Sequence, residues 1–253
     1  MTLLVEAPAG RHFAQFHRDA DSLTETAFVF LQSGLRHGKS LLVIAPSRRV
    51  EQLFDRLADG KVHIKSLVDS GQLAVMDSTP IIEQLVSNGQ TEWAQFRGML
   101  GPVLARLAPR GHGTRIYAEI ANVLWEAGET DAAIRLEDLW NALAAAHTFS
   151  LFCGYTMDTQ SEHAYARPLE ELGRTHSDIL GTREDERFGA ALDRASRDLF
   201  GISLTQMVGA ADQDGTRRFP SGQRTMLWVR RNLPTSAAQL VERARVCYSA
   251  DRS

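Results

Sequence analysis

The five residues LLVIA at positions 41–45 decide the fold class. They form a short, unbroken apolar run, and similar runs follow as QLAVMD at 72–77, TRIYAE at 114–119 and FSLFC at 149–153. Such runs are typical of strands that helices bury on both faces. Stretches with the apolar period of a helix lie around them, at about 20–33, 47–58, 79–87, 91–108 and 129–147. This alternation predicts an α/β fold with a mainly parallel sheet.

Length and composition exclude several classes of protein. The 253 residues are 43% hydrophobic and 23% charged, so the chain can bury a full core. A net charge of -3 gives no global attraction to nucleic acid or to an anionic membrane. No apolar run approaches the roughly 20 residues that cross a bilayer, and the N-terminus lacks a signal-peptide pattern. Because Cys153 and Cys247 form no CxxC motif, we expect a cytoplasmic protein with no membrane partner.

The character of the chain changes after residue 158, where strand-like runs disappear and the sequence becomes polar and helical. An amphipathic helix is predicted within 187–209. We therefore predict a first domain at 1–160 and a helical C-terminal module at 161–253.

The end of the chain is its one basic part, with eight arginines and two acids from residue 215 to 253. Two helices around NLPT at 232–235 would suit a helix-turn-helix, but Trp228 and Val229 need burial and the pattern between them is incomplete. We therefore favour docking on a partner protein, or on a second copy of the chain as a homodimer, over DNA binding.

The string GLRHGKS at 34–40 ends like a phosphate-binding P-loop. A P-loop has four residues between its glycines, whereas three separate Gly34 from Gly38. A P-loop also follows a strand and opens a helix, whereas this string closes a helix and enters a strand. We interpret it as a helix-to-strand loop in which both glycines supply turn geometry.

Six short stretches, taken together, resemble one known family. They are HFAQF at 12–16, FLQSGLRHG at 30–38, GQL at 71–73, RIYAE at 115–119, LEDLWN at 136–141 and LFCGY at 151–155. Their order and spacing resemble the MEDS domain, the sensory domain named after methanogens, methylotrophs and the dichloromethane-responsive regulator DcmR. That family in turn resembles the RecA/KaiC ATPase core. The resemblance implies a RecA-like three-layer sandwich and leaves the residues after about 160 uncovered.

The same resemblance predicts that the chain is not an enzyme. Aligned with the ATPase core, its P-loop would lie before residue 20, where no glycine occurs between Gly10 and Gly34. Glu119 could occupy the position of the magnesium-linked Asp of those ATPases. One carboxylate without a phosphate cradle does not make a nucleotide hydrolase.

Ligands of open α/β sheets bind beyond the carboxyl ends of the strands, where Asp77 and Glu119 are predicted. A lone acid there is more often a helix cap, but the MEDS resemblance carries an acid at Glu119, and Arg115 lies four residues earlier. His12 and His17 could line the vacated nucleotide cavity. Their spacing matches no metal motif, so no metal site is predicted.

A second group lies on the helix predicted at 129–147, where Glu137 and Asn141 are one turn apart beside Trp140. With Trp125, they would form an aromatic-walled pocket for a small organic effector, although core aromatics with solvated acids would give the same pattern. Cys153 falls in a buried strand, which predicts an inert thiol. The predicted ligand-binding residues are His12, Phe16, His17, Arg115, Glu119, Trp125, Glu137, Trp140 and Asn141.

The function implied by the resemblance is that of a non-catalytic bacterial or archaeal sensory protein. A small effector would occupy the vacated nucleotide site, and the C-terminal helices would signal to a transcription-regulatory or signalling partner. Such signalling requires the effector to favour one of two states. Two alternatives stay open: a KaiC-like nucleotide-binding ATPase, and an adaptor that binds proteins but no small molecule. The sequence identifies neither the effector nor a cofactor.

Overall fold

The computed structural model describes residues 2–87, 90–91, 93–108, 112–165, 167–210 and 219–250. The chain divides into two compact units. Met1–Ala14 and Asp19–Thr156 make up the first unit, and Gln15–Arg18 and Met157–Ser253 make up the second. The first unit ends four residues before the boundary predicted at 160.

The sheet has six strands, all parallel, in the order β3-β2-β6-β7-β1-β8, as the apolar runs predict. The strands are β1 (His12–His17), β2 (Ser40–Ala45), β3 (Leu73–Asp77), β6 (Thr114–Ala118), β7 (Phe149–Thr156) and β8 (Asp178–Leu180). Sequence analysis missed β1, whose histidines and glutamine interrupt the apolar pattern. The expectation that strands end at residue 158 was wrong at β8, because three residues are too few to show a periodic pattern.

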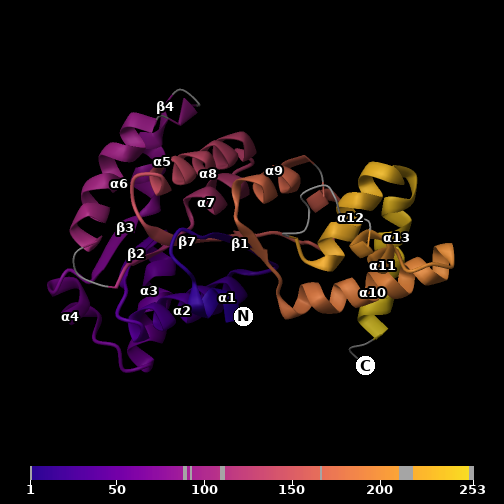
Figure 1. The fold of residues 1–253 in the computed structure, drawn as a ribbon, viewed down its shortest axis with the longest axis horizontal. Coiled ribbons are helices and arrows are strands. Elements are labelled where there is room, and N and C mark those ends of the chain that lie inside the picture. The colour runs from indigo at the N-terminus through magenta and orange to yellow at the C-terminus, as the bar shows by residue number, and fades with distance from the viewer. Residues whose placement is uncertain are drawn as a thin grey trace. The chain divides into compact units, whose positions relative to one another are not determined.

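Helices cover both faces of the sheet in the first unit, which gives the three layers. They are α1 (Thr2–Glu6), α2 (Ala20–Arg36), α3 (Ser47–Asp59), α4 (Ile64–Asp69), α5 (Ser78–Leu85), α6 (Trp93–Leu107), α7 (Ile120–Glu126) and α8 (Thr130–Ala144). Figure 1 shows α2 and α3 on one face and α7 and α8 on the other. Two-residue strands β4 (Val86–Ser87) and β5 (Gln90–Thr91) pair antiparallel, so the helix predicted at 79–87 is too long by two residues.

Strand β7 shows how one strand serves both layers, because successive side chains of a strand point to opposite faces. Phe152 faces α2, with its ring centroid 5.5 Å from that of Phe30. Gly154 faces the same way, and a Cβ there would lie 2.0 Å from Leu23 Cδ1. Helix α2 can therefore pack this closely on β7 only because residue 154 is a glycine. Cys153 and Tyr155 point to the other face, toward Glu137 of α8.

The string GLRHGKS connects α2 to β2, as a helix-to-strand loop would. Gly34 does not turn the chain there as expected. It lies inside α2, where a Cβ would come within 2.8 Å of Arg115 Cδ, so its role is close packing. Gly38 makes the turn with a φ of 66°. Lys39 donates to the carbonyl of His112, and Ser40 Oγ donates to the Leu107 carbonyl at 3.0 Å.

The second unit is mainly helical, as predicted. Its elements besides β8 are η2 (Glu162–Tyr165), α9 (Arg167–Thr175), α10 (Arg183–Phe200), α11 (Leu204–Ala210), α12 (Ser221–Asn232), η4 (Pro234–Ser236) and α13 (Ala237–Ala250). A capping box of Thr182 and Asp185 opens α10, and Gly201 closes it with a φ of 72°. Val229 is buried, whereas Trp228 is half-buried. Across the described ranges, no helix is both long and apolar enough to span a membrane.

Candidate functional site

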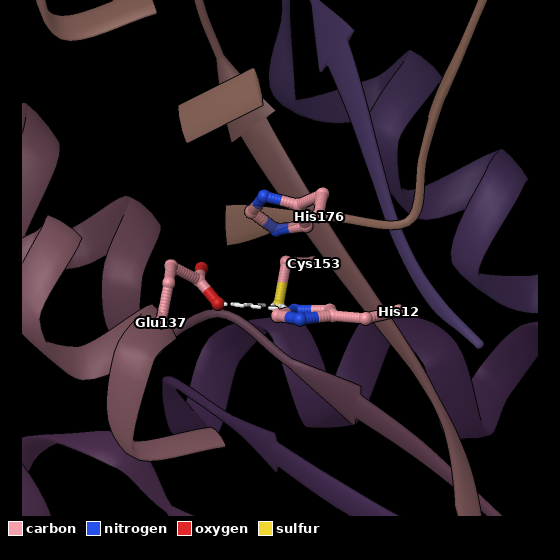
Figure 2. A group of neighbouring side chains, drawn as sticks. All are labelled: His12, Glu137, Cys153 and His176. Carbon is pink, nitrogen blue, oxygen red and sulfur yellow. Dashed lines mark hydrogen bonds and ion pairs between the residues drawn. The ribbon is translucent and has the colours of Figure 1, made fainter. Parts of the chain in front are cut away.

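Four buried polar side chains meet on the α8 face of the sheet, and we call them the polar centre: His12, Glu137, Cys153 and Tyr155. His12 Nε2 lies 3.1 Å from Glu137 Oε2 and 3.4 Å from Cys153 Sγ. Cys153 Sγ lies 3.5 Å from the same Glu137 oxygen. Figure 2 shows the first three of these side chains converging; His176, also drawn there, belongs to the second unit.

The sheet order creates this convergence. Strand β1 lies beside β7, and Leu151 N donates to the Arg11 carbonyl at 2.9 Å. Helix α8 buries an apolar stripe that includes Leu136, Trp140 and Leu143, but Glu137 occupies one position of that stripe and is 0% exposed. Burying a carboxylate is costly unless it is paired, so its partners in the polar centre are what permit it.

Two further contacts orient His12 and Glu137 within the polar centre. The amide oxygen of Asn141 lies 3.0 Å from His12 Nδ1. Because that oxygen only accepts, the ring N–H at Nδ1 donates in this contact, and Nε2 is the nitrogen that faces Cys153 and Glu137. On the other side, the Tyr155 hydroxyl donates to Glu137 Oε1 and leaves Oε2 for the centre.

The polar centre does not have the environment of a nucleophilic cysteine. Burial raises the pKa of the Cys153 thiol well above its usual value of 9.0, and the neighbouring Glu137 carboxylate raises it further. Burial and Glu137 likewise raise the pKa of Tyr155. Reactive cysteines have a lowered pKa in electropositive, partly exposed places. The raised pKa of Cys153 is the opposite shift, and it agrees with the inert thiol expected from the sequence.

Glu119 belongs to a second cluster, at the carboxyl end of β6. Arg49 Nε donates to Glu119 Oε1 at 2.8 Å, and the Tyr117 hydroxyl donates to the same oxygen at 2.5 Å. Burial raises the pKa of Glu119, while Arg49 opposes that shift. Its side chain makes no capping bond to α7. Asp77, in contrast, accepts a hydrogen bond from Thr79 N at 2.8 Å. This is the ordinary structural role of an acid that follows a strand, rather than a functional one.

The aromatic candidates pack in the core around the polar centre. Trp125 contacts Tyr155 edge to face at a centroid distance of 6.0 Å. Trp140 is 1% exposed and packs edge to face on Phe96 at 4.9 Å and on Phe149 at 6.1 Å. Its buried indole N–H has no hydrogen-bond partner within the part of the chain that the structure describes.

The structure therefore sorts the predicted residues into groups. His12, Glu137 and Asn141 meet in or beside the polar centre, with Trp125 reaching it through Tyr155. Glu119 joins Arg49. Arg115 points to the opposite face, where α2 covers it. Phe16 and His17 are buried and belong to the second unit.

Sequence reasoning missed Cys153 and Tyr155 as members of the site. The sequence predicts only an inert buried thiol at Cys153, and Tyr155 enters only as part of the stretch LFCGY. The two residues lie two apart in one strand, so they share a face. That spacing was the available signal, but the sequence did not show that β1 and α8 would supply partners to that face.

An all-parallel α/β domain with a buried polar centre describes the class of the first unit. A comparison with family models identifies the family: residues 11–177 match MEDS, the methanogen/methylotroph, DcmR sensory domain. This match spans well over half of the chain, so the chain belongs to the MEDS family of sensory domains. It also includes every residue of the polar centre. A search of curated proteins returned no match.

Proposed function

We propose that this chain is a non-catalytic sensory protein that binds a small effector at the polar centre. The observation that carries the proposal is the convergence of His12, Glu137 and Cys153 inside a domain of a sensory family. Glu137 is a fully buried carboxylate in the apolar stripe of a helix, and its burial depends on polar partners. Effector binding would give this costly arrangement a function.

The N-terminus of α2 supports a function other than nucleotide hydrolysis. A phosphate cradle would lie between β1 and α2, where helix N–H groups attract anions. Asp19 caps this helix, and its Oδ1 accepts from Ser22 N at 2.7 Å. The carboxylate satisfies the donor that a phosphate would use and repels a second anion. We therefore favour a sensor over a divergent ATPase.

The chemistry of the polar centre favours a small polar effector rather than a large apolar one. Glu137 and Cys153 offer both hydrogen-bond donors and acceptors. The buried indole N–H of Trp140, which has no hydrogen-bond partner among the described residues, offers a further donor on the same helix as Glu137. Residues 137 and 140 are one turn apart, so both face the sheet side of α8. An effector that forms hydrogen bonds with these groups would stabilise one position of α8 relative to another.

The C-terminal helices are proposed to carry the signal to a partner, a transcription-regulatory or signalling protein. They expose apolar residues suited to protein contact: Val246 of α13 is 55% exposed and Leu233, after α12, is 36% exposed. Arg230 and Arg231, which precede Leu233 in the sequence, are also exposed. A mixed apolar and basic surface of this kind suits a protein partner of acidic character.

The test is thermal unfolding of the full chain with a panel of small organic and one-carbon compounds, and with ATP or GTP plus magnesium. A ligand at about 100 times its Kd adds roughly 2.7 kcal/mol to stability. We expect a shift with an organic compound, lost in Glu137→Gln and kept in Asp138→Asn, an exposed acid on the same helix. A shift with nucleotide alone would overturn the proposal in favour of an ATPase. No shift with any compound, together with a stable protein partner, would favour the adaptor.

A further inference from the structure

We infer that the polar centre is a metal site, in which His12 Nε2, Glu137 Oε2 and Cys153 Sγ bind one divalent ion of the zinc type. The inference deepens the proposed function, because it places an ion where the effector is proposed to act. It uses three ligand types that zinc prefers, namely imidazole, carboxylate and thiolate. Sequence spacing offered no such site, because the three residues come from β1, α8 and β7.

The ligand atoms have the separations that a tetrahedral ion requires. Zinc bonds of about 2.0–2.3 Å at tetrahedral angles place neighbouring ligand atoms about 3.3–3.6 Å apart. The observed distances are 3.1 Å from His12 Nε2 to Glu137 Oε2, 3.4 Å from Nε2 to Cys153 Sγ, and 3.5 Å from Sγ to Oε2. The three atoms therefore already form one face of a zinc tetrahedron.

Each ligand is also held in the orientation that metal binding needs. His12 Nδ1 bonds to Asn141, and Nε2 is the ring nitrogen that faces Glu137 and Cys153. Glu137 Oε1 accepts from Tyr155, so Oε2 is the oxygen left for the ion. Metal-binding histidines and carboxylates are ordinarily fixed by such outer hydrogen bonds. Both outer partners are present on the side away from the proposed ion.

Charge balance favours an ion in this place. His12 Nε2 and Glu137 Oε2 lie 3.1 Å apart, a close approach that a proton or a cation between the two atoms would stabilise. A divalent ion with one thiolate and one carboxylate is neutral overall, which suits a buried site. A bound ion would also deprotonate Cys153, since coordination removes the thiol proton outright.

The three ligands of the first unit leave one position of a tetrahedral ion for a further donor. Metal sites with three protein ligands commonly use that position for function. The chemical class of effector this favours is a small molecule with a thiol or carboxylate group. Binding there would add a metal bond to the hydrogen bonds of the polar centre.

The experiment measures metal binding directly on the full chain. We expect about one zinc per purified chain by elemental analysis, removal by a chelator, and rebinding of cobalt(II) with a thiolate-to-cobalt charge-transfer band and tetrahedral d–d bands. Cys153→Ser should abolish the charge-transfer band, whereas Cys247→Ser, which changes the other free cysteine, should keep it. Asn141→Ala should weaken zinc affinity about 10–100-fold through loss of the outer hydrogen bond.

Several results would overturn the inference. They are no cobalt binding by the folded chain, an unchanged charge-transfer band in Cys153→Ser, or a band lost in Cys247→Ser. Circular dichroism of every variant separates lost binding from lost folding, and the exposed Asn141 provides a variant that leaves the core intact. An effector-induced shift that survives metal removal would overturn the metal site but keep the sensor. Metal binding without any effector response would keep the site and overturn the sensor.

Discussion

The first unit buries charged groups on both faces of its sheet, and the two groups differ in their partners. On the α8 face, His12, Glu137 and Cys153 converge on one another. On the α2 face, Arg115 is 0% exposed and donates mostly to backbone carbonyls. Its Nη1 reaches Phe30 O at 2.8 Å, and its Nη2 reaches Val5 O and Glu6 O at 2.7 and 3.0 Å.

This difference separates a structural charge from a functional one. Arg115 lies over the Phe30 ring at 5.1 Å, and burial lowers its pKa to about 10. Its bonds tie α1 and α2 to β6, which explains the burial without any ligand. In the polar centre, His12, Glu137 and Cys153 instead contact one another's side chains, together with those of Tyr155 and Asn141. Burial of a charge therefore says little about function until its partners are known.

The largest expected loss of stability comes from removing the structural charge, Arg115. Arg115→Met would remove the donor of the buried Phe30 carbonyl and of the partly buried Val5 and Glu6 carbonyls. Hydrogen bonds to charged groups contribute about 1.5–3 kcal/mol each, so we expect a loss of about 5 kcal/mol. Glu137→Gln keeps an acceptor for Tyr155 and should cost less than about 1.5 kcal/mol. Denaturant unfolding of both variants measures this. Equal losses would contradict the division into structural and functional charges.

Trp140→Ala should come next, with a loss of about 4 kcal/mol, because removing a buried Trp leaves a cavity. Trp140→Phe keeps the contacts to Phe96 and Phe149 and should lose far less. Thermal unfolding compares the two variants. If Trp140→Ala is as stable as the wild type, Trp140 lines a cavity rather than filling the core, and it belongs with the polar centre.

A smaller effect is expected from Glu119→Gln, and it depends on pH. Burial raises the folded-state pKa of Glu119 above its ordinary value of 4.5, against the effects of Arg49 and Tyr117 and with a small contribution from Glu126. The folded state therefore holds the proton more tightly than the unfolded state. Its stabilising contribution is complete below pH 4.5 and falls as the pH rises through the folded pKa.

Unfolding free energies of wild type and Glu119→Gln over this range provide the measurement. The difference, wild type minus variant, should decrease as the pH rises. An increase would mean that the ion pair with Arg49 outweighs burial and that the Glu119 cluster resembles the structural Arg115 more than the polar centre.

The smallest effect concerns Asp77, at the exposed end of β3. A hydrogen bond from Ser47, aided by Thr79 N, lowers the pKa of Asp77 below 3.8. Its contribution is present above pH 3.8 and is lost as the pH falls through the folded pKa. Ser47→Ala should raise this pKa in an NMR titration and change stability by less than about 0.5 kcal/mol. A larger change would place Asp77 among the structural charges.

The sequence predicted much of the fold because buried parallel strands carry their own signal. The run at 41–45 and its three counterparts became β2, β3, β6 and β7. Strand β1 was missed because it contains the polar residues His12, Gln15 and His17. All three are buried, although buried strands usually have apolar sequences. The missed strand is also the one that delivers His12 to the polar centre.

The sequence by itself determined the parallel α/β architecture and the family, because both depend on local apolar patterns and ordered short stretches. It also excluded a P-loop, because that motif depends on spacing within a few residues. Only the tertiary structure decided which side chains meet. The sheet order places β1 beside β7, so that His12 reaches Cys153 across 141 positions of sequence and Glu137 of α8 closes the group. Local sequence patterns do not show which distant residues become neighbours, because these side-chain contacts form only when the helices pack on the sheet.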